Sequence, residues 1–195
     1  NEQPNTFYLF QQVYDKDGKA IQNAFVDRDG NGKITEADRY LTGKSPMAKV
    51  FMGLSSEFTY RNWDLGFNLR ANLGNYVFNS LASGNSTTYN YSGKGFLVNY
   101  YEAIYKTGFT QINSTEQGAS DYFLENASFL KMDNITLGYS FKKLFTNRLS
   151  GRISASVQNV FTITKYSGLD PETSAVDGSM WPRPRTFTLG INLNF

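Results

Sequence analysis

The feature that most constrains the fold is a strict alternation of apolar and polar residues at the C-terminal end. In residues 185–195, apolar side chains stand at every odd position from Phe187 to Phe195, and the polar residues between them carry no charge. A period of two is the spacing of side chains on one face of a β-strand. This segment therefore predicts a strand with one apolar and one polar face.

The same alternation recurs along the chain and predicts an all-β, antiparallel fold. The clear segments are residues 50–60, 63–71, 135–141 and 151–161, and a weaker one is residues 6–14. Within 151–161, Asn159 is the one polar residue on the apolar face. Each clear segment is about as long as a tilted strand that crosses a bilayer, or slightly shorter. We therefore expect five or six strands.

Alternation alone does not say what the apolar face contacts, because a soluble sheet packed on a core gives the same pattern. Two features favour lipid. The polar faces use Gly, Ser, Thr and Asn with scattered charges, which is typical of a wet barrel lumen. Aromatic residues stand at the ends of the apolar stripes, where membrane interfaces lie. These residues are Tyr60, Trp63, Phe141, Phe161 and Phe195.

The lengths of the connections point the same way. Residues 61–62 and 142–150 are short links, whereas 15–49, 72–128 and 162–184 are long. If the C-terminus lies at the periplasmic side, every long connection is extracellular, which is the plan of an outer-membrane barrel. Five or six strands cannot close a barrel, and an open edge cannot face lipid. The sequence therefore predicts a transmembrane β-barrel segment with long extracellular loops, belonging to a larger barrel.

Composition excludes several kinds of chemistry. The chain has no His and no Cys, so Ser–His–Asp and Cys–His catalysis, His-ligated zinc and disulfides are ruled out. The net charge of +2 without a dense basic run argues against nucleic acid as a partner. A glycosidase using two carboxylates stays open by composition, but no convergent pair is identifiable. Because no catalytic set of residues is identifiable, we expect no enzyme.

One segment resembles a calcium-binding loop. Oxygen-bearing residues recur at alternate positions, and Gly32 stands where such loops turn sharply. The candidate ligands are Asp27, Asp29, Asn31, Lys33 through its carbonyl, Thr35 through its hydroxyl or a water, and Asp38. Asp38 occupies the place where a bidentate Glu is usual. A structural calcium ion that fixes an extracellular loop is one interpretation; a polar turn without metal is the other.

Two further groups of residues have open interpretations. Aromatic side chains in the longest connection could stack on sugars, or could serve loop packing and contacts with a lid protein. They are Tyr89, Tyr91, Phe96, Tyr100, Tyr101 and Tyr105. Charges on the polar strand faces could line a solute path, or could be lumen charges that meet a plug or water. They are Glu57, Asp64, Arg70 and Arg152.

Several ordered motifs resemble one family. Residues 156–172 (SVQNVFTITKYSGLDPE) and 184–195 (PRTFTLGINLNF) closely resemble the end of SusC/RagA-type TonB-dependent transporters. Residues 26–35 (VDRDGNGKIT), 62–65 (NWDL) and 74–76 (GNY) match that family in the same order. The resemblance covers nearly the whole chain and is loosest in residues 80–117.

This resemblance implies a function and partners. Such transporters have an N-terminal plug inside a barrel of about 22 strands, and residues 1–195 would be the C-terminal segment of that barrel. The resemblance implies TonB-dependent uptake of glycan or peptide fragments through the bacterial outer membrane of Bacteroidota. It implies a SusD-like lipoprotein as partner, and contact with the TonB complex through a missing N-terminal part. The alternative is a secreted, calcium-stabilised β-sandwich that binds carbohydrate.

Overall fold

The computed structural model describes residues 5–91, 99–144, 149–178 and 181–194 and divides into two compact units. The strand unit comprises Lys49–Leu73, Ser128–Lys165 and Pro182–Phe195. The loop unit comprises Asn1–Ala48, Gly74–Ala127 and Tyr166–Trp181. Among the described residues, no helix is long and apolar enough to cross a membrane.

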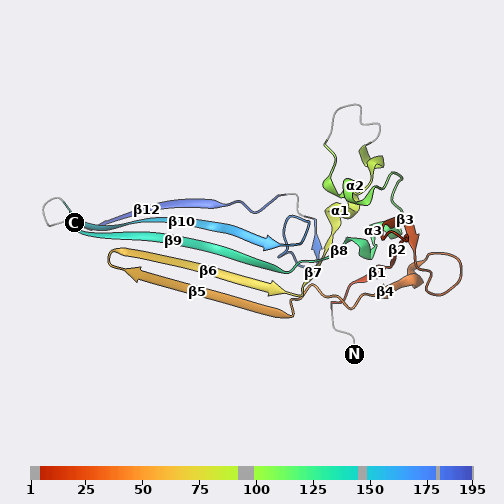
Figure 1. Cartoon of the computed structure of the whole chain (residues 1–195), viewed down its shortest axis with the longest axis horizontal. Coiled ribbons are helices and arrows are strands. Elements are labelled where there is room, and N and C mark those ends of the chain that lie inside the picture. Colours follow the sequence, from red (N-terminus) through yellow and green to blue (C-terminus); the bar gives the residue numbers. More distant parts are fainter. Residues whose placement is uncertain (1–4, 92–98, 145–148, 179–180, 195) are drawn as a thin grey trace. The chain divides into compact units, whose positions relative to one another are not determined.

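The strand unit is one antiparallel sheet with the strand order β12-β10-β9-β6-β5 (Figure 1). Its strands are β5 (Val50–Tyr60), β6 (Trp63–Leu73), β9 (Phe129–Leu144), β10 (Leu149–Thr164) and β12 (Thr186–Asn194). The five clear sequence segments are thus confirmed as strands. β9 and β10 are longer than their alternating cores, at 16 residues each. Because neighbours run antiparallel, the three long connections leave the sheet at one end and the short ones at the other.

The prediction of a sixth strand in residues 6–14 is wrong. This segment forms two short strands, β1 (Tyr8–Phe10) and β2 (Gln12–Tyr14), which pair with β4 (Arg39–Leu41) and β3 (Ala20–Phe25) in the loop unit. The neighbouring residues Leu9 and Phe10 are both buried, which a strand with one wet face does not allow. The local alternation therefore reflected a small folded core, and no membrane strand.

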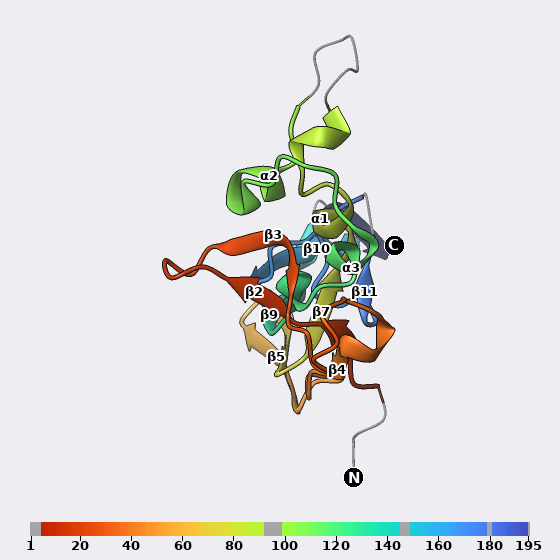
Figure 2. The same ribbon diagram turned by 90° about the vertical axis from the view of Figure 1, so that its right-hand side faces the viewer.

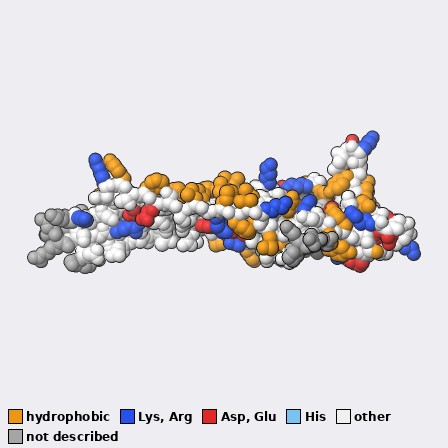
Figure 3. All heavy atoms as spheres, turned by 90° about the horizontal axis from the view of Figure 1, so that it is seen from below, with side chains coloured by type: hydrophobic (Ala, Val, Ile, Leu, Met, Phe, Trp, Pro, Cys, Tyr) orange, Lys and Arg blue, Asp and Glu red, His pale blue; other side chains and the backbone are white. Residues whose placement is uncertain are grey.

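The register aligns the apolar residues of all five strands on one face. Phe58 pairs with Leu65, Leu65 with Leu137, and that row continues through Ala155 to Leu189. The residues Phe187 and Leu189 are 73% and 72% exposed. Figure 3 shows hydrophobic side chains gathered along one side of these strands, with polar side chains on the other. A sheet packed on a soluble core would bury the apolar side.

Two β-bulges interrupt the register near the end that bears the long connections. One lies between Asn68 and Leu69 where β6 pairs with β9, and the other lies between Gln158 and Phe161 where β10 pairs with β9. Asn159, the polar misfit of the sequence pattern, lies in the second bulge with φ +53°. A bulge inserts an extra residue and turns the strand locally, so a polar side chain here leaves the apolar stripe intact.

The three long connections fold together into the loop unit. Its remaining elements are α1 (Ser80–Gly84), α2 (Glu102–Thr107), α3 (Thr115–Gly118), the 3-10 turns η1 (Glu36–Asp38), η2 (Thr88–Tyr91) and η3 (Asp121–Phe123), and the sheet of β11 (Val176–Asp177), β7 (Tyr76–Asn79) and β8 (Leu124–Asn126). α3 contacts β3 and α1 (Figure 2). The core combines side chains from distant segments: Leu9, Ala20, Phe78, Ala82, Ala103, Phe109, Phe123 and Leu124.

Buried amides tie this core together. The Gln12 amide group donates to the carbonyls of Ile21 (2.7 Å) and Ala24 (3.0 Å), which fixes the β2–β3 hairpin. The Gln12 side-chain oxygen accepts from Gln117 (2.8 Å) and from the Ser120 hydroxyl (3.0 Å). Because both glutamines are buried, leaving either amide unpaired would cost its desolvation. The connections therefore form a specific fold of their own.

Candidate functional site

The acidic loop brings three of its predicted ligands together. Carboxylate oxygens of Asp27, Asp29 and Asp38 lie within 4.8 Å of one another. Gly30 and Gly32 make this possible, since both have positive φ (+73° and +76°), which a residue with a Cβ rarely adopts. The sharp turn that the sequence predicted at Gly32 is thus present.

Asp38 holds the loop in place through hydrogen bonds to its backbone. Its side chain is buried, and its two oxygens accept from the backbone N–H groups of Arg28 and Thr35, each at 2.7 Å. Thr35 in turn caps η1, so residues 35 and 38 form a capping box. The Thr35 N–H, with help from the N–H groups of Arg28 and Asp29, lowers the pKa of Asp38, while burial acts in the opposite direction. Asp38 is therefore held as a carboxylate facing the other two.

The remaining candidate ligands lie in the same turn. The Asp27 carboxylate accepts from the N–H groups of Gly30 and Gly32 (2.8 Å each). The Asn31 side-chain oxygen accepts from the Lys33 N–H at 2.7 Å. The Asn31 amide donates to Asp29 at 2.7 Å. Backbone donors thus position the side chains of the loop.

The chemistry of the donor set fits a hard cation. Carboxylate, amide and carbonyl oxygens are the ligands that calcium prefers. Among the described residues, no Lys or Arg side chain forms an ion pair within 4.0 Å with any of the three carboxylates. The guanidinium of Arg28 instead lies over the Tyr40 ring, 4.4 Å from its centroid, and donates to Gln11 at 2.8 Å.

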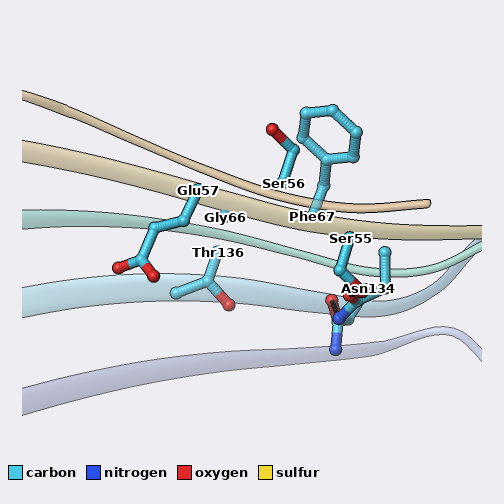
Figure 4. Close-up of a pocket in the computed structure, with 8 residues that line it drawn as sticks. Ser55, Ser56, Glu57, Gly66, Phe67, Asn134 and Thr136 are labelled. Atoms are coloured by element: carbon cyan, nitrogen blue, oxygen red, sulfur yellow. Dashed lines mark hydrogen bonds between the residues drawn. The ribbon is translucent and has the colours of Figure 1, made fainter.

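The polar face of the strand unit carries a pocket of about 370 Å³. Figure 4 shows Ser55, Glu57, Asn134 and Thr136 on one side of the strands, with Ser56 and Phe67 pointing the other way. Ser55 donates to Asn68 at 2.5 Å, and Asn68 donates to Asn134 at 2.9 Å, so the hydroxyl and amides form a ladder across three strands. Apart from Glu57 the lining is neutral, and such groups can hydrogen-bond a polar solute.

The predicted charges on the polar face are mostly paired. Arg152 on β10 forms an ion pair with Asp64 on β6. The pair spans Gly138 of β9, where a Cβ would overlap both charged groups. Arg70 pairs with Asp133 of β9, a partner that the sequence pattern did not reveal because Asp133 lies at a bulge. Both pairs join strands on the polar face, and both interpretations of these charges, a solute path and lumen charges that meet a plug or water, stay predictions.

The described aromatic residues of the longest connection differ in their exposure. Tyr89, Tyr100 and Tyr105 are exposed, whereas Tyr101 packs against the core of the loop unit. Phe96 and the side chain of Tyr91 lie outside the described residues. Both interpretations of this group remain predictions.

Comparison with known proteins gives the context of these features. No protein-family model matches the chain. The TonB-dependent receptor SusC of Bacteroides thetaiotaomicron is 46% identical over 198 residues, an alignment that covers 98% of this chain and 19% of that receptor. TonB-dependent receptor P3 of Formosa agariphila is 29% identical, with 88% of this chain and 19% of that receptor covered.

Solved structures agree on the fold. The RagAB peptide transporter superposes with a TM-score of 0.71 at 23% identity, over 98% of this chain and 23% of that chain. The RagAB peptide importer in the open-open state gives 0.70 at 20% identity, over 98% of this chain and 22% of that chain. At these identities the likeness concerns the fold alone. The chain spans about a fifth of the length of the relatives it matches.

An exposed apolar face, a polar face with paired charges, and these relatives together point to one class: nearly the whole chain is similar to part of the TonB-dependent receptors. Among these receptors the chain resembles the SusC/RagA type, as its ordered motifs predicted. The named relatives are receptors and transporters, in line with the expectation of a protein that performs no covalent chemistry.

Proposed function

We propose that this chain forms the C-terminal part of the barrel wall of an outer-membrane receptor for TonB-dependent nutrient uptake. The observation that carries the proposal is the five-stranded sheet whose apolar face is exposed and continuous from β5 to β12. Lipid would cover that face, and strands of the same polypeptide would pair with the free edges of β5 and β12. The relatives are named TonB-dependent receptors, which supports energy-coupled uptake.

The solute and the partners extend this proposal. The solutes are glycan or peptide fragments; the names of the RagAB structures state peptide transport for that protein. A SusD-like surface lipoprotein captures the solute with the loop unit, and the TonB complex acts through a plug. The long connections lie outside the cell and the C-terminus lies at the periplasmic side. A β-sandwich would require a second layer on the apolar face, so the secreted carbohydrate-binding module has less support.

Deletion of the gene tests the uptake function. We expect the deletion strain to lose growth on at least one member of a panel of oligosaccharides and short peptides supplied as sole nutrient. Reintroducing the gene should restore growth, and a protonophore should abolish uptake in the wild-type and the complemented strains. Unchanged growth on the whole panel, or recovery of the protein from culture medium without detergent, would contradict the proposal.

The acidic loop is also proposed to hold a structural calcium ion. Asp27, Asp29, Asn31 and Asp38 would supply side-chain oxygens, and Lys33 and Thr35 a carbonyl and a hydroxyl or water-mediated contact. The carboxylates converge, and among the described residues no Lys or Arg side chain forms an ion pair with them within 4.0 Å; both observations support this proposal. The ion would offset the mutual repulsion of the three carboxylates and fix residues 27–38.

Hydrogen exchange of the intact receptor, with and without chelator, tests the calcium site. Removing calcium should increase exchange in residues 27–40 and leave the strands β9 and β10 protected. Asp27→Ala should show the same increase at every calcium concentration, because it removes a ligand. Asp17→Ala, at another exposed turn, is the matched control. A loop whose exchange is identical in chelator and in millimolar calcium would reject the metal.

A further inference from the structure

The pocket on the polar face of the strand unit holds a carboxylate beside an open gap. Of its described lining residues only Glu57 is charged, and the pocket has a volume of about 370 Å³. In the register, Gly66 of β6 lies between Glu57 of β5 and Thr136 of β9. Because Gly66 has no side chain, no group of the middle strand separates the carboxylate from the hydroxyl. Both lie on the same side of the strands (Figure 4).

A second glycine on this face shows how such a gap can be filled. Gly138 lies opposite Asp64, and Arg152 spans it to form an ion pair with that carboxylate. Beside Glu57 the gap ends instead at Thr136, which carries no charge. Arg152 also attracts Glu57 electrostatically, but among the described residues no Lys or Arg forms an ion pair with Glu57 within 4.0 Å. Two carboxylates therefore share one guanidinium, and this group of three keeps a net negative charge.

A row of neutral groups lies two positions further along the same strands. Ser55, Asn68 and Asn134 stand opposite one another in the register, and all three line the pocket. The hydrogen bonds from Ser55 to Asn68 and from Asn68 to Asn134 occupy the oxygen of Asn134, so its amide N–H groups are the donors that this row offers. At a rise of about 3.3 Å per residue, this row lies about 7 Å from Glu57, which is the length of two extended residues.

The chemistry of the gap suits a protonated amine. An ammonium group has three N–H donors and no acceptor, so it needs oxygen atoms as partners. Glu57 supplies a charged acceptor and Thr136 a neutral one on the two sides of the gap. A charge-assisted hydrogen bond to a carboxylate is roughly twice as strong as a bond between neutral groups. A sugar hydroxyl could bind here as well, but without the attraction between opposite charges.

We propose that this pocket binds a protonated amine of the transported solute as the solute moves along the polar face. The inference rests on the proposed uptake function and deepens it, because it selects peptides with a free N-terminus or oligosaccharides with amino sugars among the candidate solutes. The amine supplies to Glu57 the cation that Arg152 supplies to Asp64. The neutral row at Asn134 hydrogen-bonds the carbonyl or hydroxyl groups that follow the amine.

Calorimetric titration of the intact receptor in detergent tests the inference with two matched pairs of probes. One pair is tetra-alanine and N-acetyl-tetra-alanine, and the other is the glucosamine trimer and its N-acetylated form. We expect the amine of at least one pair to bind more tightly than its acetylated partner, and the pair that responds identifies the source of the amine. Glu57→Gln should weaken that amine about tenfold, equivalent to about 1.4 kcal/mol, and leave the acetylated partner unchanged. A preference for tetra-alanine should disappear at about pH 9, because an α-amino group loses its charge near pH 8.

Two glycine variants test the gap itself. Gly66→Ala places a methyl group in the gap and meets the Ser56 carbonyl oxygen at 3.8 Å, an ordinary contact, so the variant should fold. It should weaken the amine as much as the loss of the carboxylate does. Gly53→Ala is the matched control, because it lies on the same strand as the carboxylate, outside the pocket lining and with nothing within 4 Å of the added Cβ. Asp17→Asn removes an exposed carboxylate of the loop unit, and both controls should leave all probes unchanged.

Three outcomes would overturn the inference. They are the absence of any preference for the amine in both pairs, an equal loss for amine and acetylated probes in Glu57→Gln, and a preference for tetra-alanine that persists at about pH 9. If acetylated solutes still enter cells in a receptor-dependent way, only the amine site fails. If the deletion strain transports everything that the wild type does, the uptake function fails as well, and the two failures are thus distinguishable.

Discussion

The substitution Leu189→Arg on β12 tests which face of the sheet meets lipid. Leu189 lies in the apolar row opposite Ala155, whereas its neighbour Thr188 pairs with Ser156 on the polar face. Both side chains are exposed in the structure. A charge at position 189 should therefore enter the membrane, and the same charge at position 188 should enter the lumen.

The expected loss of folding free energy follows from the position of Leu189 along its strand. β12 has nine residues, and Leu189 is the fourth, one position from the centre. At a rise of about 3.3 Å per residue and a tilt of about 45°, it lies about 2 Å from mid-height. An arginine at the midplane of a barrel costs about 2–4 kcal/mol, which is roughly a 30-fold to several hundredfold change in the folding equilibrium. Thr188→Arg should change the free energy of unfolding by about 0.5 kcal/mol or less.

The assay is denaturant-induced unfolding of the intact receptor in lipid vesicles, together with its abundance in outer-membrane fractions. Leu189→Arg should unfold at lower denaturant concentration and be depleted, whereas Thr188→Arg should resemble the wild type. Equal behaviour of the two variants would refute the lipid-facing assignment. A more severe effect at position 188 would mean that the two faces are reversed, unless Thr188 contacts a plug.

Two further predictions concern packing and pH. A Cβ on Gly151 would overlap a backbone carbonyl of β12, so Gly151→Ala should cost about 1–3 kcal/mol in the same unfolding assay. Gly53→Ala has nothing within 4 Å and should be neutral or slightly stabilising; an equal effect of both changes would contradict the register. Burial, and then the Asp177 carboxylate to which its hydroxyl donates at 3.0 Å, raise the pKa of Tyr166. Since unfolded tyrosine ionises near pH 10, the loop unit should lose stability above about pH 10. Tyr166→Phe should reduce that loss, which hydrogen exchange measured at a series of pH values would show. An identical pH profile for the wild type and the variant would be evidence against this role of Tyr166.

The strands could be predicted because their physical cause is local. A lipid-covered or core-covered face requires an apolar residue at every second position, and this requirement is visible in a single segment such as residues 185–195. The alternation of short and long connections then gives the topology. The polar misfit Asn159 was visible too, but only the cross-strand register identifies it as part of a bulge.

The loop unit could not be predicted, because its contacts are distant in sequence and lack a period. Gln12 and Gln117 are 105 positions apart, and each residue alone is an ordinary polar side chain. The same limitation explains the false strand at residues 6–14, where a short alternation is produced by two strands of different sheets. Of the acidic loop, the turn and the converging carboxylates followed from spacing, because consecutive ligands need no tertiary information.

The ion pair between Asp64 and Arg152 could be predicted in part, unlike the strands, which could be predicted fully, and the loop unit, which could not. Alternation correctly placed both charges on the polar face, yet the residues are 88 positions apart and occupy strands that do not pair with each other. They meet because Gly138, directly opposite Asp64 on the strand between them, has no side chain to separate them. A glycine on the polar face of a central strand is therefore a site where charges of the two flanking strands can meet. Once the register is known, that rule identifies the pair from the sequence.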